Sequence, residues 1–381
     1  MTVADIKPYV LLTGGLGYIG SHTVIKLIQR HYNVVIFDNL VNSKVETLSR
    51  IQEVLSVESP ELSNDGLLFF QVDLRQLDDM KEIIEREFVG KNRRITSIIH
   101  FAGLKSVNES VKDPLLYYDY NFVSSLNLLK LVQAYQIHHF IFSSSATVYG
   151  DVTKFENPSE YLPLRENQTT KIPINPYGNT KHLVERLLED YANSNPDFQV
   201  GILRYFNPIG AHPSHLIGED PLNEPLNLLP IIANYSKLNK TLKVYGGDYQ
   251  TKDGTCIRDY IHIEDLSRGH VLALNKLELL GPITISQQAE LDMTVNYHEW
   301  NLGKGVGYSV LDIIKQWNKS TGIQVNYEIV PRRDGDVEIL VADVEKSEKE
   351  LGFICQFDLK DACQDLWGWT SHYFNSLKLE K

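Results

Sequence analysis

Tyr177 and Lys181 have side chains and a four-residue spacing that could support acid–base catalysis. On a helix, side chains at positions i and i+4 lie on one face, so this phenol and this ammonium can share a site. An ammonium close to a phenol favours the phenolate and lowers its pKa, which makes a base that is usable near neutral pH. Ser145, upstream of the pair, adds a hydroxyl at the end of an expected strand.

A glycine-rich turn at Gly14, Gly17 and Gly20 predicts a binding site for a dinucleotide, which would accept a hydride. The turn lies between an expected strand at 9–13 and an expected helix at 22–30. Glycines let the backbone approach a pyrophosphate, which then faces the free N–H groups of the helix N-terminus. Two residues separate each pair of glycines, unlike the single residue that opens the commonest dinucleotide fingerprint. The base and the dinucleotide site together predict alcohol oxidation, or a reaction that passes through one.

Acidic and amide residues at the ends of the next strands predict the choice of dinucleotide. Asp38 and Asn39 follow an expected strand at 33–37. A carboxylate there hydrogen-bonds the ribose hydroxyls and repels a 2′-phosphate, so NAD is favoured over NADP. Asp73 follows the apolar run 67–72 and is a candidate adenine contact. The structural alternatives are a loop cap for Asp38 and a surface turn for Asp73.

The order of apolar runs predicts the elements that position these residues. Expected strands are 9–13, 33–37, 97–101, 139–144 and 200–204, and expected helices are 22–30, 115–133 and 177–192. This alternation is typical of βαβ units and predicts an α/β fold with a doubly wound parallel sheet. Segment 56–65 is interpreted as a polar loop.

The pattern changes after residue 206 and becomes rich in turns. A helix at 310–320 and a strand at 325–329 predict a smaller, mixed α/β lobe. We therefore expect an NAD-binding domain at 1–206 and a mainly substrate-binding lobe at 207–381, with some segments returning to the first domain. Segment 283–299 is interpreted as a variable loop without an assigned role.

Composition limits the classes of partner. The chain has 381 residues, 43% of them hydrophobic, and a net charge of −12, which argues against nucleic acid and anionic membranes. Its three cysteines, Cys256, Cys355 and Cys363, fit neither a disulfide framework nor a metal site. We find no signal peptide and no membrane span, so we expect a soluble cytoplasmic protein without a metal.

Eight segments resemble one family. They are residues 13–22, 38–39, 100–105, 143–150, 177–181, 204–213, 258–262 and 332–336. In order and content they resemble the UDP-glucose 4-epimerases of the extended short-chain dehydrogenase/reductase superfamily. The similarity covers roughly residues 9–369, which is nearly the whole chain.

The resemblance implies a set of binding residues. The implied cofactor contacts are Gly14, Gly17, Tyr18, Ile19, Gly20, Asp38, Asn39, Asp73, Leu74, Phe101, Ala102, Lys105, Asn121, Ser144, Tyr177, Lys181, Tyr205 and Phe206. The implied substrate contacts are Ser145, Tyr177, Asn207, Asn227, Leu228, Val244, Tyr245, Arg258, Arg333, Asp336 and Leu340. Arg258 and Arg333 would clamp a diphosphate, a role suited to the planar guanidinium, although surface ion pairs are the alternative.

The resemblance also implies a mechanism. Tyr177 would remove the proton of the sugar 4-hydroxyl while hydride leaves C4 for tightly bound NAD. Lys181 and the nicotinamide charge would lower the Tyr177 pKa, and Ser145 would relay the proton. The sugar would then turn over while the protein holds UDP. Related dehydratases carry an Asp-Glu pair after the serine position, whereas this chain has Ala146 and Thr147, so dehydration is not expected.

Alternatives differ in substrate or in activity. Leu340, intermediate in size, stands where the family varies a side chain beside the hexose, so activity on N-acetylhexosamines stays open. A uronate or pentose 4-epimerase, an NAD-sensing regulator and a hydroxysteroid-type dehydrogenase are the other candidates. From the family we expect a homodimer through helices 115–133 and 177–192. We expect no aldose 1-epimerase domain in this chain, which ends at Lys381.

Overall fold

A computed structural model describes residues 7–62, 66–167, 172–222, 225–281, 296–333 and 336–379, with side chains up to 372. Its centre is a seven-stranded sheet in the order β10-β6-β5-β4-β1-β2-β3, and every neighbouring pair is parallel. The strands are β1 (Lys7–Thr13), β2 (Val34–Asp38), β3 (Leu67–Gln71), β4 (Arg93–His100), β5 (His139–Ser145), β6 (Gln199–Tyr205) and β10 (Tyr297–Leu302).

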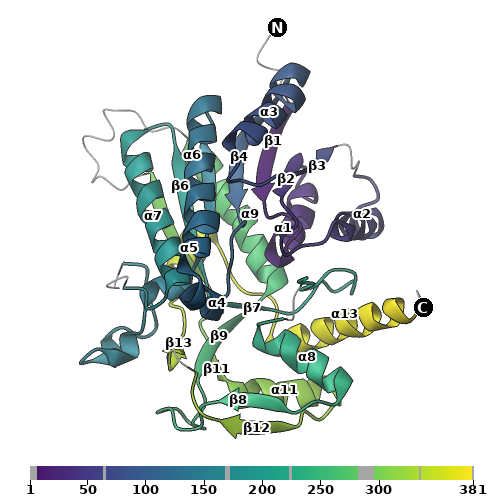
Figure 1. Ribbon diagram of the computed structural model, residues 1–381, viewed down its shortest axis with the longest axis vertical. Coiled ribbons are helices and arrows are strands. Elements are labelled where there is room, and N and C mark those ends of the chain that lie inside the picture. The colour runs from purple at the N-terminus through teal and green to yellow at the C-terminus, as the bar shows by residue number, and fades with distance from the viewer. Residues whose placement is uncertain are drawn as a thin grey trace.

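Helices cover both faces of this sheet because its strands are apolar on both sides (Figure 1). In β1, Val10 and Leu12 face one core cluster while Tyr9 and Leu11 face the other. The first cluster includes α1 (Tyr18–Ile28), α2 (Glu46–Glu58) and α9 (Ile263–Leu280). The second includes α3 (Leu77–Glu87), α6 (Ser124–Tyr135) and α7 (Pro176–Ser194). The predicted doubly wound parallel sheet is confirmed.

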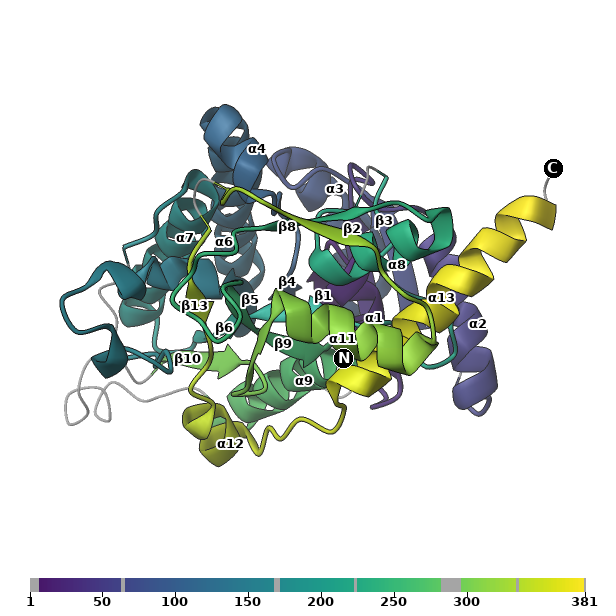
Figure 2. The same ribbon diagram turned by 90° about the horizontal axis from the view of Figure 1, so that it is seen from below.

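A smaller lobe lies beyond the carboxyl ends of the strands (Figure 1, Figure 2). One mixed sheet contains β7 (Asn207–Ile209), β9 (Ile257–His262), β11 (Gly307–Ser309) and β13 (Ile339–Leu340). A parallel pair is formed by β8 (Leu242–Tyr245) and β12 (Tyr327–Val330). Helices α8 (Leu228–Leu238), α11 (Val310–Thr321) and α13 (Leu359–Leu379) pack with them. The predicted mixed lobe is therefore present.

Short elements fill the connections. They are α4 (Val107–Lys112), α5 (Pro114–Tyr117), α12 (Glu345–Leu351) and the 3₁₀ turns η3 (Val89–Lys91), η5 (Ala146–Tyr149), η6 (Val152–Lys154) and η7 (Pro158–Glu160). The helix predicted at 115–133 is in fact three pieces, α5, the π-helical segment η4 (Tyr118–Val123) and α6. Hydrophobic periodicity does not reveal such a change of helix type, because the chain direction continues.

Two loop predictions were wrong in part. The polar segment 56–65 begins inside α2, which ends at Glu58, and residues 63–65 lie outside the described part. Of segment 283–299, residues 283–295 lie outside the described part, while 297–299 begin β10. The strand was missed because its partner, β6, is far away in sequence. Together α9 and β10, both beyond residue 206, complete the first sheet and its helical cover.

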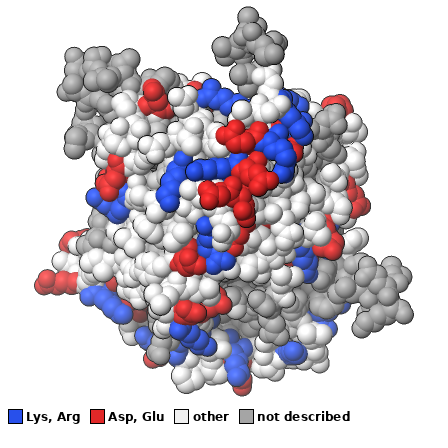
Figure 3. Space-filling view, turned by 45° about the horizontal axis from the view of Figure 1, so that its top comes forward, with Lys and Arg blue, Asp and Glu red and all other residues white. Residues whose placement is uncertain are grey.

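The surface and the thiols agree with the composition. Acidic and basic side chains are interspersed on the face shown in Figure 3. Cys256, Cys355 and Cys363 are free thiols. Within the described ranges, no helix has both the length and the apolar character to cross a membrane, and no group of three or more His, Cys, Asp or Glu is arranged for a metal.

Candidate active site

The residues of the expected chemistry meet where β5 ends beside α7. Ser145 is the last residue of β5, and its hydroxyl shares a hydrogen bond with the Tyr177 phenol. The Lys181 ammonium is buried and donates to the Ser143 carbonyl at 2.7 Å. Its nitrogen lies 6.0 Å from the centre of the Tyr177 ring. The structure therefore brings the three predicted catalytic residues into one cluster.

The first turn of α7 positions Tyr177. Pro176 occupies the first helical position, where a missing N–H is tolerated and the fixed φ suits a helix. Asn175 caps the helix, because its side-chain oxygen accepts from the Gly178 N–H at 2.8 Å. This capped start holds the Tyr177 ring against the end of β5. Lys181 follows one turn later on the same face.

Burial dominates the titration of both groups. It raises the pKa of Tyr177, and the hydrogen bond with Ser145 opposes that shift. It lowers the pKa of Lys181 to about 8, and the Glu185 carboxylate opposes that shift. This differs from the expectation that Lys181 lowers the Tyr177 pKa, because the ammonium turns toward Ser143 and phenolate desolvation is the larger effect. Any lowering by Lys181 is therefore smaller than the effect of burial, and the net shift of the Tyr177 pKa is upward.

Asn121 ties the loop after β4 to α7. It lies in η4, and wide helical turns of this kind are often found at functional sites. Its Oδ1 accepts from the Leu104 N–H at 2.8 Å, and its Nδ2 donates to the Thr180 hydroxyl at 3.0 Å. A Cβ on Gly103 would lie 3.8 Å from the Lys181 nitrogen. Asn121 therefore shapes the loop that passes beside the lysine.

The glycine turn fits a diphosphate. Gly14 has a φ of 67°, and a Cβ there would lie 2.8 Å from the Ala102 nitrogen. Gly17 precedes α1 as its cap without any side chain, and the first turn of α1 contains no acidic residue. A Cβ on Gly20 would overlap the Gly14 carbonyl. The positive end of α1 is thus open to an anion at close backbone approach.

Asp38 joins this turn to the next loop. One carboxylate oxygen accepts from the Leu16 N–H at 3.1 Å. The other accepts from the Leu40 N–H at 2.9 Å and the Ser43 hydroxyl at 2.8 Å. The loop-capping alternative is therefore realised. The same carboxylate lies beside the glycine turn, where the predicted ribose contact would be made.

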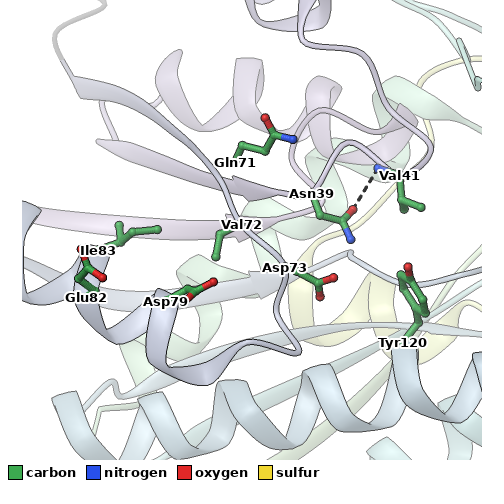
Figure 4. Close-up of a pocket in the computed structure, with 9 residues that line it drawn as sticks. All are labelled: Asn39, Val41, Gln71, Val72, Asp73, Asp79, Glu82, Ile83 and Tyr120. Atoms are coloured by element: carbon green, nitrogen blue, oxygen red, sulfur yellow. Dashed lines mark hydrogen bonds between the residues drawn. The ribbon is translucent and has the colours of Figure 1, made fainter.

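A pocket opens past the ends of β2 and β3 (Figure 4). It is lined by Asn39, Val41, Gln71, Val72, Asp73, Asp79, Glu82, Ile83 and Tyr120. Asn39 and Asp73 were both predicted as cofactor contacts. Arg75 donates to Asp73 at 2.7 Å, lowers its pKa, and stacks 3.8 Å from the Tyr120 ring centre. The three carboxylates in this lining disfavour a further phosphate.

Two predicted contacts from different parts of the chain meet on one carboxylate. The Lys105 ammonium lies 2.6 Å from a Glu219 oxygen, and the Asn227 amide donates to both Glu219 oxygens at 2.9 and 3.0 Å. Nearby, the Tyr18 hydroxyl donates to the Gly210 carbonyl at 2.7 Å. Glu219 was missed from the sequence, because a lone glutamate in a polar loop has no distinguishing pattern.

The expected diphosphate clamp lies in the smaller lobe. Arg333 forks onto Asp336 at 3.0 and 3.2 Å, and its guanidinium lies 4.7 Å from the Tyr245 ring centre. Arg258 donates to two backbone carbonyls, at 2.9 and 3.3 Å. Burial raises the pKa of the Cys256 thiol, and Arg258, Asp336 and Arg333 are all close enough to influence it.

The remaining predicted residues lie in several elements around the end of β5 and in the smaller lobe. Leu340 pairs with Arg258 in the β13–β9 register and packs in a cluster with Ala146 and Phe206, beside Ser145. Asn207 begins β7, Leu228 begins α8, and Ile19 lies in the first turn of α1. Phe101 and Tyr205 both pack against His270.

Three predicted contacts have side chains that are turned away from the site. The Ser144 hydroxyl donates to Glu185 at 2.6 Å. Leu74 and Val244 are buried in the clusters of the sheet and of the smaller lobe, respectively. A ligand would meet these three residues through their backbone, because their side chains pack elsewhere. One candidate was missed, the Thr147 hydroxyl, which is buried and has no hydrogen-bond partner among the described residues.

Comparison with known proteins agrees with this geometry. A model of the NAD dependent epimerase/dehydratase family matches residues 10–285, and the chain belongs to this family. It is 42% identical over 94% of its length to the UDP-glucose 4-epimerase of Yersinia enterocolitica, of which it covers 96%. The resemblance stated from the sequence is confirmed.

Two further relatives extend the comparison. The chain is 43% identical over 97% of its length to the bifunctional protein gal10 of Schizosaccharomyces pombe, and it spans 48% of that relative. It thus spans about half the length of the bifunctional relatives it matches. A UDP-glucose-4-epimerase from Stenotrophomonas maltophila, solved with bound NAD and formylated UDP-arabinopyranose, superimposes with a TM-score of 0.83 at 39% identity. That match covers 97% of this chain and 99% of the other.

Proposed function

We propose that this chain is an NAD-dependent UDP-glucose 4-epimerase that interconverts UDP-galactose and UDP-glucose. One observation carries the proposal: Ser145, Tyr177 and Lys181 meet at the end of β5, and Ala146 and Thr147 follow instead of carboxylates. A 4-epimerisation needs one base at the 4-hydroxyl, whereas elimination of water needs a further acid and base. The full-length similarity to the Yersinia enterocolitica enzyme supports the same activity.

The chain has the residues that NAD requires. Gly14, Gly17 and the N-terminus of α1 would hold the diphosphate, and Asp38 would hold the adenosine ribose. The acidic pocket containing Asn39 and Asp73 would take the adenine. When bound, NAD supplies a hydride acceptor at sugar C4 and then the donor that returns the hydride to the opposite face.

Tyr177 would take the proton of the sugar 4-hydroxyl and later give it back. Ser145, hydrogen-bonded to the phenol, would contact the same sugar oxygen. Burial raises the Tyr177 pKa, so the phenolate needs added positive charge. The Lys181 ammonium and the cationic nicotinamide would both lower that pKa. The base therefore becomes effective when the cofactor is in place.

The two ends of the substrate would be held differently. Arg258, Arg333 and Asn227 would hold the diphosphate, and Asp336 would hold the uridine ribose once it exchanges its present partner, Arg333. The hexose would lie against Leu340 and the apolar cluster beside Ser145. An apolar wall binds the sugar without fixing one face, which permits the 4-keto sugar to turn over.

The proposal includes a cytoplasmic homodimer. Helices α5 and α6 both contact α7 on the same side of the sheet (Figure 1). Leu115 on α5 is 79% exposed and Leu183 on α7 is 41% exposed. Apolar side chains at these positions favour packing against a second copy.

Turnover of UDP-galactose without added NAD tests the function. We expect UDP-glucose to form, measured by direct chromatographic separation, because each turnover regenerates NAD and the cofactor stays bound. UDP-N-acetylgalactosamine, a UDP-uronate and a UDP-pentose are assayed in parallel. Turnover of one of these alone would move the assignment to that 4-epimerase. Bound cofactor without any turnover would favour a regulatory role, and light-scattering mass would test the dimer.

A further inference from the structure

Three consecutive serines at the end of β5 face three residues of α7 that are spaced four apart. Ser145 hydrogen-bonds Tyr177, and the Ser143 carbonyl accepts from Lys181. The third contact is the Ser144 hydroxyl, which donates to Glu185 at 2.6 Å. Residues 177, 181 and 185 lie on one face of the helix. The chemistry described above uses the first two contacts and leaves the third without a role.

Glu185 belongs to a buried charge cluster behind the catalytic residues. Its two oxygens accept from Arg204 at 3.0 and 2.9 Å, and the Arg204 side chain is fully buried. Arg204 also lies 2.5 Å from Glu299 and donates to the Tyr149 hydroxyl and the Glu166 carbonyl. A buried carboxylate with this many partners is fixed in place.

We propose that Glu185 is a positioning residue for the proposed epimerase reaction. Its carboxylate holds the end of β5 in register with α7, and its charge keeps the Lys181 side chain as an ammonium. The proposal rests on the proposed function, because Lys181 matters only if Tyr177 acts as the base.

The charges around Lys181 support this role. Burial lowers the pKa of Lys181 to about 8, and Glu185 is the carboxylate that opposes this shift within the described part of the chain. Among the described residues, the other titratable groups in this cluster include Tyr177 on α7, His100 on β4 and Tyr205 on β6. Burial keeps His100 neutral, since it lowers that pKa to about 3. Arg204 turns its guanidinium to Glu185 and Glu299, so its charge is balanced within the cluster.

The test compares pH profiles of kcat for wild type, Glu185→Gln and Glu185→Asp. In wild type, we expect kcat to fall at high pH as Lys181 loses its proton. In Glu185→Gln we expect this alkaline limb to move to lower pH by about one unit, because the neighbouring negative charge is gone. Glu185→Asp retains the charge and should keep the wild-type limb. KM for UDP-galactose should stay within about twofold, because Glu185 faces away from the expected nucleotide site.

Two matched variants separate charge from packing. Glu189→Gln removes a carboxylate one turn further along α7, where it pairs with Arg186 at the surface, and should leave the limb unchanged. Ser144→Ala breaks the bond to Glu185 but keeps its charge. It should lower kcat several-fold without moving the limb, an effect of positioning alone.

A second readout does not depend on turnover. The rate at which an amine-acylating reagent modifies Lys181, followed by peptide mass spectrometry across about pH 6 to 10, reports the lysine pKa directly. An unshifted limb and an unshifted modification profile in Glu185→Gln would overturn the inference. If that variant fails to fold, a limb shift in Glu185→Asp or Ser144→Ala would overturn it equally. Absence of turnover in wild type would instead refute the proposed function, whereas the modification profile would still show whether Glu185 raises the Lys181 pKa.

Discussion

At the end of β5, Lys181 is 6% exposed and bonds across to a neighbouring strand, whereas Arg333 in the smaller lobe is 45% exposed and bonds to Asp336 three residues along its own loop. The first arrangement joins elements that the sheet already holds together. The second is a local ion pair in contact with solvent. Exposed pairs of this kind contribute roughly 0–1 kcal/mol, so their partners exchange easily.

This difference separates chemistry from binding. The groups for proton transfer are buried and held by hydrogen bonds before any ligand arrives, which is the preorganisation that catalysis requires. The groups expected to hold UDP must leave each other to take the nucleotide. We therefore expect substitutions at the end of β5 to act mainly on kcat, and substitutions in the smaller lobe to act mainly on KM.

The largest effect is expected for Tyr177→Phe. Removing the phenol removes the base, so turnover of UDP-galactose should fall by about a thousandfold or more. NAD and UDP-sugar binding should be retained, because the ring remains. Chromatographic assay of the product and equilibrium binding of UDP-galactose measure the two quantities. Turnover close to wild type would contradict the assignment of the base.

Gly14→Ala should weaken NAD binding by roughly a hundredfold or more. An alanine here combines a φ of 67° with a Cβ that lies 2.8 Å from the Ala102 nitrogen, so the turn must open. Gly322→Ala is the control, since its φ is 74° but a Cβ there would meet nothing within 4 Å. The cofactor content after gel filtration distinguishes the two. Equal losses in both variants would show that backbone strain alone is responsible.

Arg333→Ala should raise KM for UDP-galactose roughly tenfold to a hundredfold and leave kcat within a few-fold. The reason is loss of a phosphate contact that is made equally in the ground and transition states. Arg332→Ala is the matched control, because its guanidinium pairs with Asp248 and stacks on Tyr249. Steady-state kinetics of both variants provide the measurement. A fall in kcat without a change in KM would indicate that Arg333 acts in the chemical step and not in nucleotide binding.

Leu340→Tyr should change substrate preference by about tenfold. A larger ring beside Ala146 and Phe206 leaves less room for an N-acetyl group. We expect the ratio of kcat/KM for UDP-N-acetylgalactosamine to that for UDP-galactose to fall. An unchanged ratio would remove Leu340 from the sugar wall.

Acid should lower the stability of the part of the protein that contains the seven-stranded sheet. Of the predicted changes, this one has the smallest effect on activity near neutral pH. Burial lowers the pKa of His22, His100 and His270 to about 3 each. Unfolded histidine titrates near about 6.5, so the stability from these neutral rings is present above that pH and is lost as the pH falls toward 3. Thermal midpoints should decline as the pH falls from about 6.5 to 5, while midpoints above about pH 7.5 stay level. A flat profile across the whole range would contradict this.

Local patterns in the sequence determined much of the fold and the centre of the site. The four-residue spacing of Tyr177 and Lys181, the glycine turn at Gly14, Gly17 and Gly20, and the alternation of apolar runs are all short-range. Helical period, backbone freedom and strand hydrophobicity act over a few residues, so these features can be inferred without a structure. The absence of carboxylates after Ser145 was also visible directly.

Only the tertiary structure decided which distant groups meet. Strand β10 joins the sheet beside β6, and Glu219 bridges Lys105 and Asn227. The Glu185–Arg204 pair lies hidden behind Ser144, and burial raises the Tyr177 pKa against the expectation from its lysine neighbour. Each of these depends on solvent exclusion and on partners that the chain supplies from other elements. A local sequence pattern does not reveal such contacts, because they form only when distant elements pack together.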